Sequence, residues 1–193
     1  MIRRFFYITI IFSLLISCDI FTTRNPEEPN KPSSSFLAAT SPEILFNNFK
    51  SSVEEKIIEN YISCFVDTSF LKKKFSFIPA SGSSAQYPVL NNWTIREERQ
   101  YFINLISKLP QGKNINLLME NTQKYLFGDS AVYYFDYILT INSNNQLIGG
   151  TYKGSAQFKI FYDSREQWSI VEWQDIKKEN FLCWSELKGR TAY

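Results

Sequence analysis

Apolar residues recur at helical spacing over residues 41–65. A first turn that starts at Thr40 or Ser41 carries Pro42 and Glu43, two residue types that favour the beginning of a helix. The apolar positions that follow are Ile44, Leu45, Phe46 and Phe49, and then Val53, Ile57, Ile58, Tyr61, Ile62 and Phe65. Polar residues occupy the opposite side, so the pattern predicts two consecutive amphipathic helices.

A third helix is predicted from residue 94 to about Lys108. Thr94 and Glu97 have the spacing of a capping box, in which each side chain satisfies a backbone N–H group of the first turn. One face of this helix carries Tyr101, Phe102, Leu105 and Ile106. A short strand around residues 75–79 and a loop over residues 81–92 are expected before it.

Beyond residue 112 the pattern becomes that of β-strands. Strands are predicted over residues 115–120, 131–141, 152–162 and 167–176. Short polar turns separate the last three, which predicts antiparallel neighbours. Within residues 152–162 apolar and polar positions alternate, so one face of that strand is buried and the other is wet. This order predicts an α+β fold, with about three N-terminal helices packed on one face of a curved, mainly antiparallel sheet.

A separate apolar run lies at the start of the chain. Residues 5–18 carry no charge, whereas Arg3 and Arg4 precede them. A membrane-spanning helix needs about 20 apolar residues, so the shorter run predicts an export signal. Its last four residues, Leu15-Ile16-Ser17-Cys18, resemble the lipobox of bacterial lipoproteins. The resemblance implies removal of residues 1–17, lipidation of Cys18 and anchoring to a bacterial membrane in the cell envelope; an ordinary signal peptide with a chance cysteine is the alternative.

The remaining chain divides into a tether and one domain. Residues 18–40 contain the lipidated cysteine, three prolines, a run of serines and few apolar side chains, which predicts a disordered tether. Residues 41–193 have the length of one domain and can bury a core of their own.

Charge and composition exclude several function classes. The chain has 21 Lys and Arg against 19 Asp and Glu, and removal of Arg3 and Arg4 leaves 19 of each. With no excess of positive charge, nucleic acid is not an expected partner. The sequence contains no histidine, which excludes histidine-based triads and histidine-ligated metals. Cys64 and Cys183 cannot complete a four-cysteine zinc site; they either form a disulfide or lie buried as free thiols. No metal or cofactor is expected.

Several segments carry a resemblance to a known superfamily. They are residues 41–65, Phe75-Ser76-Phe77-Ile78-Pro79, Trp93 ahead of an acidic helix, and Trp168-Ser169-Ile170-Val171-Glu172-Trp173-Gln174-Asp175. Together they resemble the nuclear transport factor 2-like superfamily, also called SnoaL-like or ketosteroid-isomerase-like, which has a cystatin-like fold. Residues 180–188 are similar to the tail of its exported bacterial members. The resemblance covers essentially the whole domain and implies a cone-shaped sheet wrapped by helices, with an enclosed pocket and frequent dimerisation. It implies no single function.

Asp136 is the one weak catalytic candidate. The ketosteroid-isomerase-like branch uses an acid as base beside tyrosines, and Asp136 lies mid-strand, where Tyr134 or Tyr152 could be near it. The alternative is a solvated strand face on which Asp136 pairs with Lys153 or Lys159.

The candidate ligand-binding residues are mostly aromatic. They are Tyr133, Phe135, Tyr137, Phe158 and Trp173, together with Asp175. An aromatic stripe of this kind either lines a pocket or simply forms the core. Asp175 has the same two interpretations, a ligand contact or a structural hydrogen bond that ties the last strand to the tail.

Three functions remain open from the sequence. The favoured one is a non-catalytic, membrane-tethered module that uses an aromatic-lined cone to bind a small apolar or amphipathic molecule, or an envelope protein. The second is an isomerase-like or dehydratase-like enzyme that uses a carboxylate and tyrosines. The third is a structural subunit of an envelope complex, or a homodimer, formed through an exposed sheet face.

Overall fold

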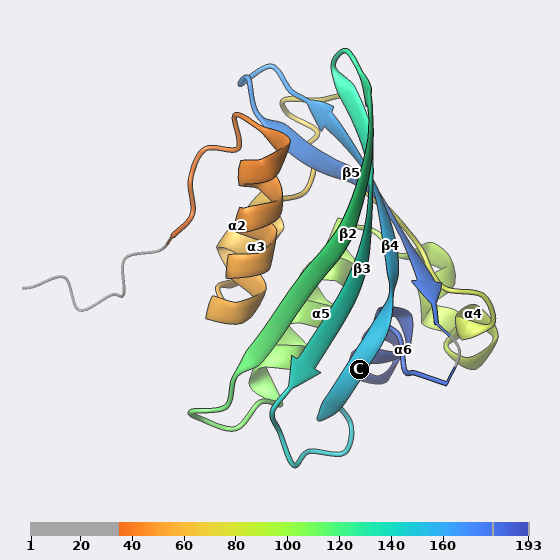
Figure 1. Cartoon of the computed structure of the whole chain (residues 1–193). Helices are drawn as coiled ribbons and strands as arrows, with labels where there is room; N and C mark the ends of the chain where they lie inside the picture. Colours follow the sequence, from red (N-terminus) through yellow and green to blue (C-terminus); the bar gives the residue numbers. More distant parts are fainter. Residues whose placement is uncertain (1–34, 179, 193) are drawn as a thin grey trace, which may run out of the picture. The chain divides into compact units, whose positions relative to one another are not determined.

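The computed structural model describes residues 35–178 and 180–192 (Figure 1). The predicted signal peptide, Cys18 and most of the predicted tether lie outside this range. The described residues belong to one compact unit that begins at Ser35.

The last residues of the predicted tether pack against the domain. The Leu37 N–H group donates a hydrogen bond to Asn48 Oδ1 at 3.0 Å. Ala39 is buried, and its carbonyl accepts a hydrogen bond from the Trp168 N–H group at 2.8 Å. The domain therefore starts ahead of the predicted boundary after residue 40, because residues 35–40 add backbone hydrogen bonds and a buried contact that a composition-based boundary misses.

Five strands form one mixed sheet. They are β1 (Ser76–Ile78), β2 (Ile115–Phe127), β3 (Ser130–Ile141), β4 (Gly150–Tyr162) and β5 (Trp168–Lys177). The order is β1-β5-β4-β3-β2. β1 pairs with β5 in parallel, and the other neighbours are antiparallel. The predicted α+β architecture is confirmed, and β4 shows the predicted alternation of buried and more exposed positions.

β2 is longer than the sequence predicted, and it contains a β-bulge just beyond the predicted end. Asn121 and Thr122 lie between the pairs Glu120–Asp136 and Gln123–Tyr134, so two residues stand opposite Phe135 alone. Asn121 has a φ of 53°. The extra residue reverses the alternation of side chains along the strand, and the prediction therefore ended at Glu120.

Two helices cover one face of the sheet near the start of the domain. They are α2 (Pro42–Glu55) and α3 (Ile58–Ser63). Ser41, one of the two caps that the sequence predicted, caps α2, because its side chain accepts a hydrogen bond from the Ile44 N–H group. α2 ends at Glu55. The next residue, Lys56, has a left-handed φ of 61° and caps the helix, since its N–H group donates to the Ser52 carbonyl. The first helix is therefore longer and the second shorter than the apolar periodicity indicated.

The remaining helices are α4 (Ser83–Gln86), the 3₁₀ helix η1 (Pro88–Asn92), α5 (Ile95–Ser107) and α6 (Trp184–Thr191). α5 and its capping box confirm the prediction. The predicted loop over residues 81–92 contains α4 and η1. Among the described residues, no helix is both long enough and apolar enough to cross a bilayer.

Aromatic rings dominate the core between helices and sheet. The Trp173 ring is fully buried and lies 5.7 Å from Phe49 of α2, 5.2 Å from Phe158 of β4 and 4.7 Å from Trp184 of α6. Tilted and edge-on contacts of this kind are favourable beyond simple burial. The core is thus closed by α6 as well as by the N-terminal helices.

Candidate functional site

The predicted ligand-binding residues do not surround one open cavity. Tyr137, Phe158 and Trp173 are buried in packed core. Trp184 of α6 occupies the space next to two of them, because its ring lies 5.3 Å from Tyr137 and 4.7 Å from Trp173. At these three positions the aromatic stripe is core, the alternative that the sequence left open.

Asp175 holds α6 against the sheet. Its carboxylate is buried and accepts hydrogen bonds from the Tyr137 hydroxyl at 2.7 Å, the Ser185 N–H group at 2.7 Å and the Ser185 hydroxyl at 2.5 Å. The Tyr137 hydroxyl also accepts the Trp184 N–H group at 2.8 Å. Asp175 therefore makes the structural tie between the last strand and the tail.

Asp136 lies on the face of the sheet that points away from the helices, whereas Tyr152 is buried on the other face. Its carboxylate binds Ser155 Oγ at 2.6 Å, Asn121 Nδ2 at 2.9 Å and Lys178 Nζ at 2.9 Å. These hydrogen bonds lower the pKa of Asp136 to about 2. A carboxylate with so low a pKa is a poor general base. Asp136 is thus ion-paired on the outer face, the alternative that the sequence left open. Its partner is Lys178 and not Lys153 or Lys159.

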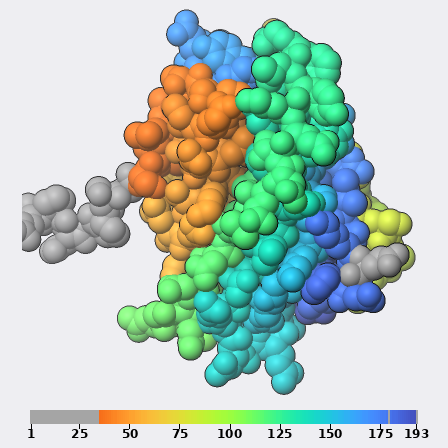
Figure 2. All heavy atoms as spheres, in the orientation of Figure 1, coloured from red at the N-terminus to blue at the C-terminus, as the bar shows by residue number. Residues whose placement is uncertain are grey.

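Tyr133 and Phe135 line a groove beside α2, which we call the α2–β2 groove. Its volume is about 440 Å³. The lining residues are Glu43, Phe46, Asn47, Lys50, Met119, Thr122, Lys124, Tyr133 and Phe135. α2 and β2 lie side by side on the molecular surface (Figure 2). The floor is aromatic, since the Phe46 ring lies 4.9 Å from Tyr133 and 4.7 Å from Phe135. Its volume suits a small ligand.

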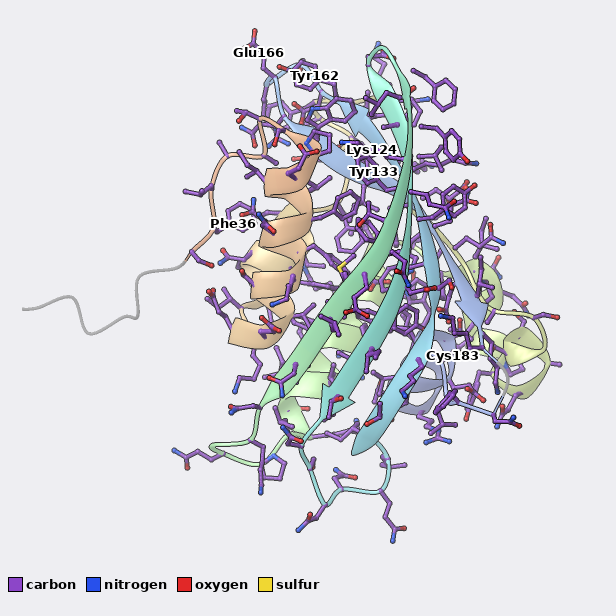
Figure 3. The ribbon with its side chains drawn as sticks, in the orientation of Figure 1. Phe36, Lys124, Tyr133, Tyr162, Glu166 and Cys183 are labelled. Atoms are coloured by element: carbon purple, nitrogen blue, oxygen red, sulfur yellow. The ribbon has the colours of Figure 1, made fainter. Side chains whose placement is uncertain are left out.

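The Tyr133 hydroxyl is the unusual polar group of this groove. The side chain is 3% exposed, and its hydroxyl is one of three buried side-chain atoms without a hydrogen-bond partner among the described residues. Burial and the negative charge of Glu43 raise the pKa of Tyr133, while Lys124 lowers it. Lys124 and Tyr133 stand together near the upper part of the sheet (Figure 3). A buried hydroxyl usually finds a partner, so this one is a candidate ligand contact.

A weak ion pair closes the rim of the groove. Lys124 Nζ of β2 lies 3.3 Å from Glu43 Oε1 of α2, and both side chains are more than half exposed. Exposed pairs of this kind contribute little stability and open easily. Lys50 adds a second ammonium group at the rim, where it pairs with Glu54 at 2.8 Å. Lys124 and Glu43 were not expected at a site, because the bulge turns Lys124 inward and Glu43 was interpreted only as a residue that favours the start of α2.

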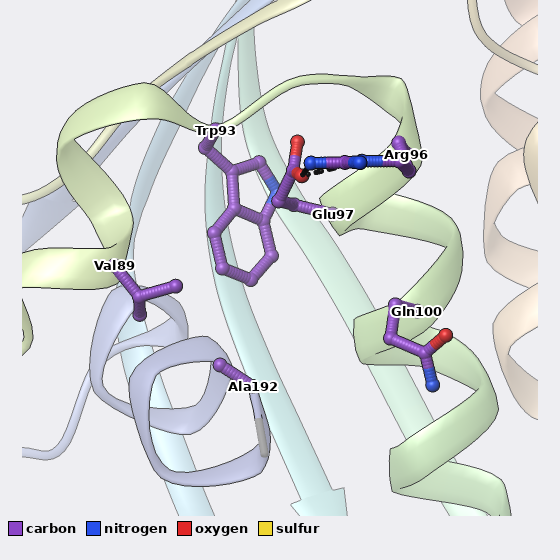
Figure 4. A pocket seen from close by; sticks show the side chains of 6 residues that line it. All are labelled: Val89, Trp93, Arg96, Glu97, Gln100 and Ala192. Carbon is purple, nitrogen blue, oxygen red and sulfur yellow. Dashed lines mark hydrogen bonds and ion pairs between the residues drawn. The ribbon is translucent and has the colours of Figure 1, made fainter.

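Two other hollows carry arginines that form ion pairs. One, of about 330 Å³, is lined by Val89, Trp93, Arg96, Glu97, Gln100 and Ala192 (Figure 4). Its Arg96 pairs with Glu97 at 2.8 Å. The other is a shallow depression of about 590 Å³ beside α3. Its Arg99 and Arg165 pair with Glu59 and Asp163, both at 2.6 Å.

Neither thiol offers a reactive site. Cys64 and Cys183 are buried and unpaired. Burial raises the pKa of both thiols, to about 12 for Cys183. No cluster of three potential metal ligands occurs within the described part of the chain.

No protein-family model and no curated protein sequence matches the chain. Several solved structures do match the chain in shape. A candidate dehydratase of the NTF2-like family from Streptomyces avermitilis is 10% identical, with a TM-score of 0.55 over 70% of this chain and 92% of that one. An NTF2-like protein of unknown function from Pseudomonas putida is 10% identical, with a TM-score of 0.52 over 69% and 82%. The fold is NTF2-like.

A third solved structure of similar shape is that of a candidate aromatic ring hydroxylase from Novosphingobium aromaticivorans. It is 13% identical, with a TM-score of 0.54 over 76% of this chain and 92% of that one. Identities this low establish the fold and leave the function to the site. In this NTF2-like domain, α6 fills the cone and the α2–β2 groove stays open.

Proposed function

We propose that the protein is a membrane-tethered envelope lipoprotein whose NTF2-like domain binds a small amphipathic molecule in the α2–β2 groove. The tether rests on the lipobox resemblance at Cys18. The binding role rests on one observation, the buried and unpartnered Tyr133 hydroxyl above an aromatic floor. A ligand that accepts a hydrogen bond there would satisfy a group that is otherwise costly to bury.

The rim suggests which end of the ligand is polar. Within the part of the chain that the structure describes, the Lys124 ammonium group pairs with Glu43 alone, and this exposed pair leaves it able to turn toward an acidic or acceptor group of a ligand. Phe46, Phe135 and Met119 would contact the apolar part. An amphipathic carboxylic acid fits both requirements.

The proposal assigns no catalysis to the groove. Glu43 is the carboxylate among its lining residues, and a hydrogen bond from its own backbone N–H group, with one from Lys124, lowers its pKa. A base of lowered pKa takes up a proton less readily. Binding without turnover is therefore the expected behaviour.

The binding test uses the chain from residue 18 with Cys18→Ser and a dansyl-labelled fatty acid, followed by fluorescence. We expect Tyr133→Phe to weaken binding about fivefold, the value of one hydrogen bond of about 1 kcal/mol. Tyr134→Phe is the matched control, because Tyr134 is the next residue and lies on the opposite face of β3. No binding of the probe, or equal losses in the two variants, would refute the groove as the site.

The tether is tested separately in cells. Cys18→Ser should abolish incorporation of labelled palmitate and release the protein from the membrane fraction, because the acyl chains supply the anchoring. Labelling that persists in this variant would rule out Cys18 as the lipidated residue and leave the binding proposal unaffected.

A further inference from the structure

The tip of the β2–β3 hairpin exposes three consecutive apolar residues. Tyr125, Leu126 and Phe127 are 55%, 62% and 62% exposed. Phe127 pairs with Ser130 across the turn, where Gly128 has a φ of 65°. The tip projects beyond the end of α2 at the top of Figure 1. Such exposed apolar runs are uncommon unless they serve an interaction.

Two further exposed apolar side chains belong to the same end of the domain. The Tyr162 N–H group donates to the Asp129 carbonyl at 2.8 Å, which places the end of β4 beside the hairpin turn. The Ser164 N–H group donates to the Phe70 carbonyl at 3.3 Å. Tyr162 and Phe70 are 36% and 38% exposed. Five of the eleven large apolar side chains exposed among the described residues thus gather at this end.

We propose that this end, led by Leu126 and Phe127, dips into the interface of a lipid bilayer. β2 and β3 remain paired up to Phe127 and Ser130, but β2 is the edge strand, so the N–H and C=O groups on its outer side must stay at the hydrated headgroup level. Tyr125 and Tyr162 suit the headgroup level, where tyrosine is enriched. Asp129 in the turn limits the depth, since a carboxylate is costly in hydrocarbon. Insertion is therefore shallow.

The charges at this end do not favour an anionic surface in particular. Lys73 lies over the Phe161 ring at 4.3 Å and Arg165 over Phe70 at 4.0 Å. Asp129 and Glu166 are exposed at the same end and offset them. Attraction to the bilayer is then mainly apolar, and neutral vesicles should bind almost as well as anionic ones.

The chain length allows the tip to reach the membrane. Residues 19–34 separate Cys18 from the first described residue, and an extended chain of that length spans at most about 55 Å. β2, with 13 residues, is about 43 Å long. A lipid on Cys18 and the hairpin tip can therefore contact the same bilayer. Two weak attachments of this kind together give stable anchoring.

The test is vesicle flotation of the chain from residue 18 with Cys18→Ser, so that the lipid cannot contribute. We expect binding to phosphatidylcholine vesicles, with little change when phosphatidylglycerol or 0.5 M salt is added. The double substitution Leu126→Ser with Phe127→Ser should weaken partitioning about tenfold or more. The control is Leu147→Ser, which removes a side chain of 49% exposure from the connection at the other end of the hairpin.

A tryptophan at the tip reports the depth. In Phe127→Trp, lipids brominated high on the acyl chain should quench fluorescence more than those brominated near its end. Three outcomes would overturn the proposal. They are no binding at millimolar lipid, an equal loss of vesicle partitioning in Leu147→Ser, and binding only to anionic vesicles at low salt. A tip variant that dissociates a dimer and leaves flotation unchanged would assign the tip to a second copy of this chain, and so would overturn it too.

Discussion

At the scale of single residues, the most unusual feature is a charged pair inside the aromatic core. Glu98 and Lys188 are completely buried, and Lys188 Nζ lies 2.5 Å from Glu98 Oε2. Glu98 also accepts the Tyr61 hydroxyl at 2.5 Å and Trp93 Nε1 at 2.6 Å. The ammonium group lies 3.7 Å from the centre of the Phe77 ring. Two of these three bonds, those to Tyr61 and Lys188, join elements that are distant in sequence.

Removing one partner of this pair should be costly. Glu98→Gln leaves the Lys188 charge buried and unpaired, so we expect the free energy of unfolding to fall by about 3–5 kcal/mol in a denaturant titration. Glu59→Gln is the control, because its pair with Arg99 is exposed and its loss should barely move the midpoint. The double variant Glu98→Gln with Lys188→Met provides the test of coupling. If it loses more unfolding free energy than the two single variants lose in sum, the pair is not the source of the effect.

The same residues show why site prediction from the sequence was partial. Lys188 and Glu98 look like ordinary surface charges in the sequence, and only the tertiary fold brings them together. For Asp136 the strand was predicted correctly. Its face could not be assigned, because the sequence does not tell which side of the sheet the helices cover. Of the aromatic candidates, Tyr133 and Phe135 reach the groove and the others are core.

At the scale of elements, α6 determines that the cone is closed. Trp184 packs edge-on against Trp173 at 4.7 Å, and its Nε1 donates to the Tyr101 hydroxyl at 2.8 Å. Leu187 and Lys188 are buried with it. One short helix thus fills the space that the sequence analysis assigned to a ligand.

Truncating the tryptophan should reopen part of that space. Trp184→Ala should lower the free energy of unfolding by about 3–5 kcal/mol, the usual cost of a large aromatic deletion in a core. Phe181→Ala, just before α6 and exposed, is the matched control. Added indole should raise the melting temperature of Trp184→Ala and leave the parent unchanged, because apolar cavities bind apolar guests. Indole stabilising both chains equally would show that no cavity has formed.

Elements with regular periodicity were predicted, and those shaped by local backbone geometry were not. The strands β3, β4 and β5 and the helix α5 follow two-residue or helical repeats, and their predicted ranges agree with the structure to within a few residues. The two misjudged boundaries coincide with left-handed residues, Lys56 after α2 and Asn121 in β2. Neither is a glycine, so the sequence gives little sign of them. The groove was missed for the same reason, since it depends on the bulge.

At the scale of the whole molecule, the stable unit begins earlier than composition suggested. Phe36 packs against the core, and Asn48 Nδ2 donates to the Leu37 carbonyl at 2.6 Å. Limited proteolysis of the mature chain should therefore stop at a fragment that starts at or before residue 36. N-terminal sequencing and intact mass identify it. A stable fragment that starts at Ser41 would show that residues 35–40 are only loosely held, and early cuts within residues 115–176 would contradict the domain itself.

The single extra residue in β2 controls what the outer half of that strand presents to each side. Asn121, held by its hydrogen bond to Asp136 at 2.9 Å, shifts the parity of every position that follows. If the same residues paired without the bulge, the two sides would be exchanged: Lys124 would leave the groove, and Tyr125 and Phe127 would turn toward α2. Deleting Asn121 would instead leave Thr122 alone opposite Phe135 and keep the pair Lys124–Tyr133, so Lys124 would stay on the groove side. The bulge therefore decides whether the outer half of β2 offers this groove a lysine or two aromatic rings.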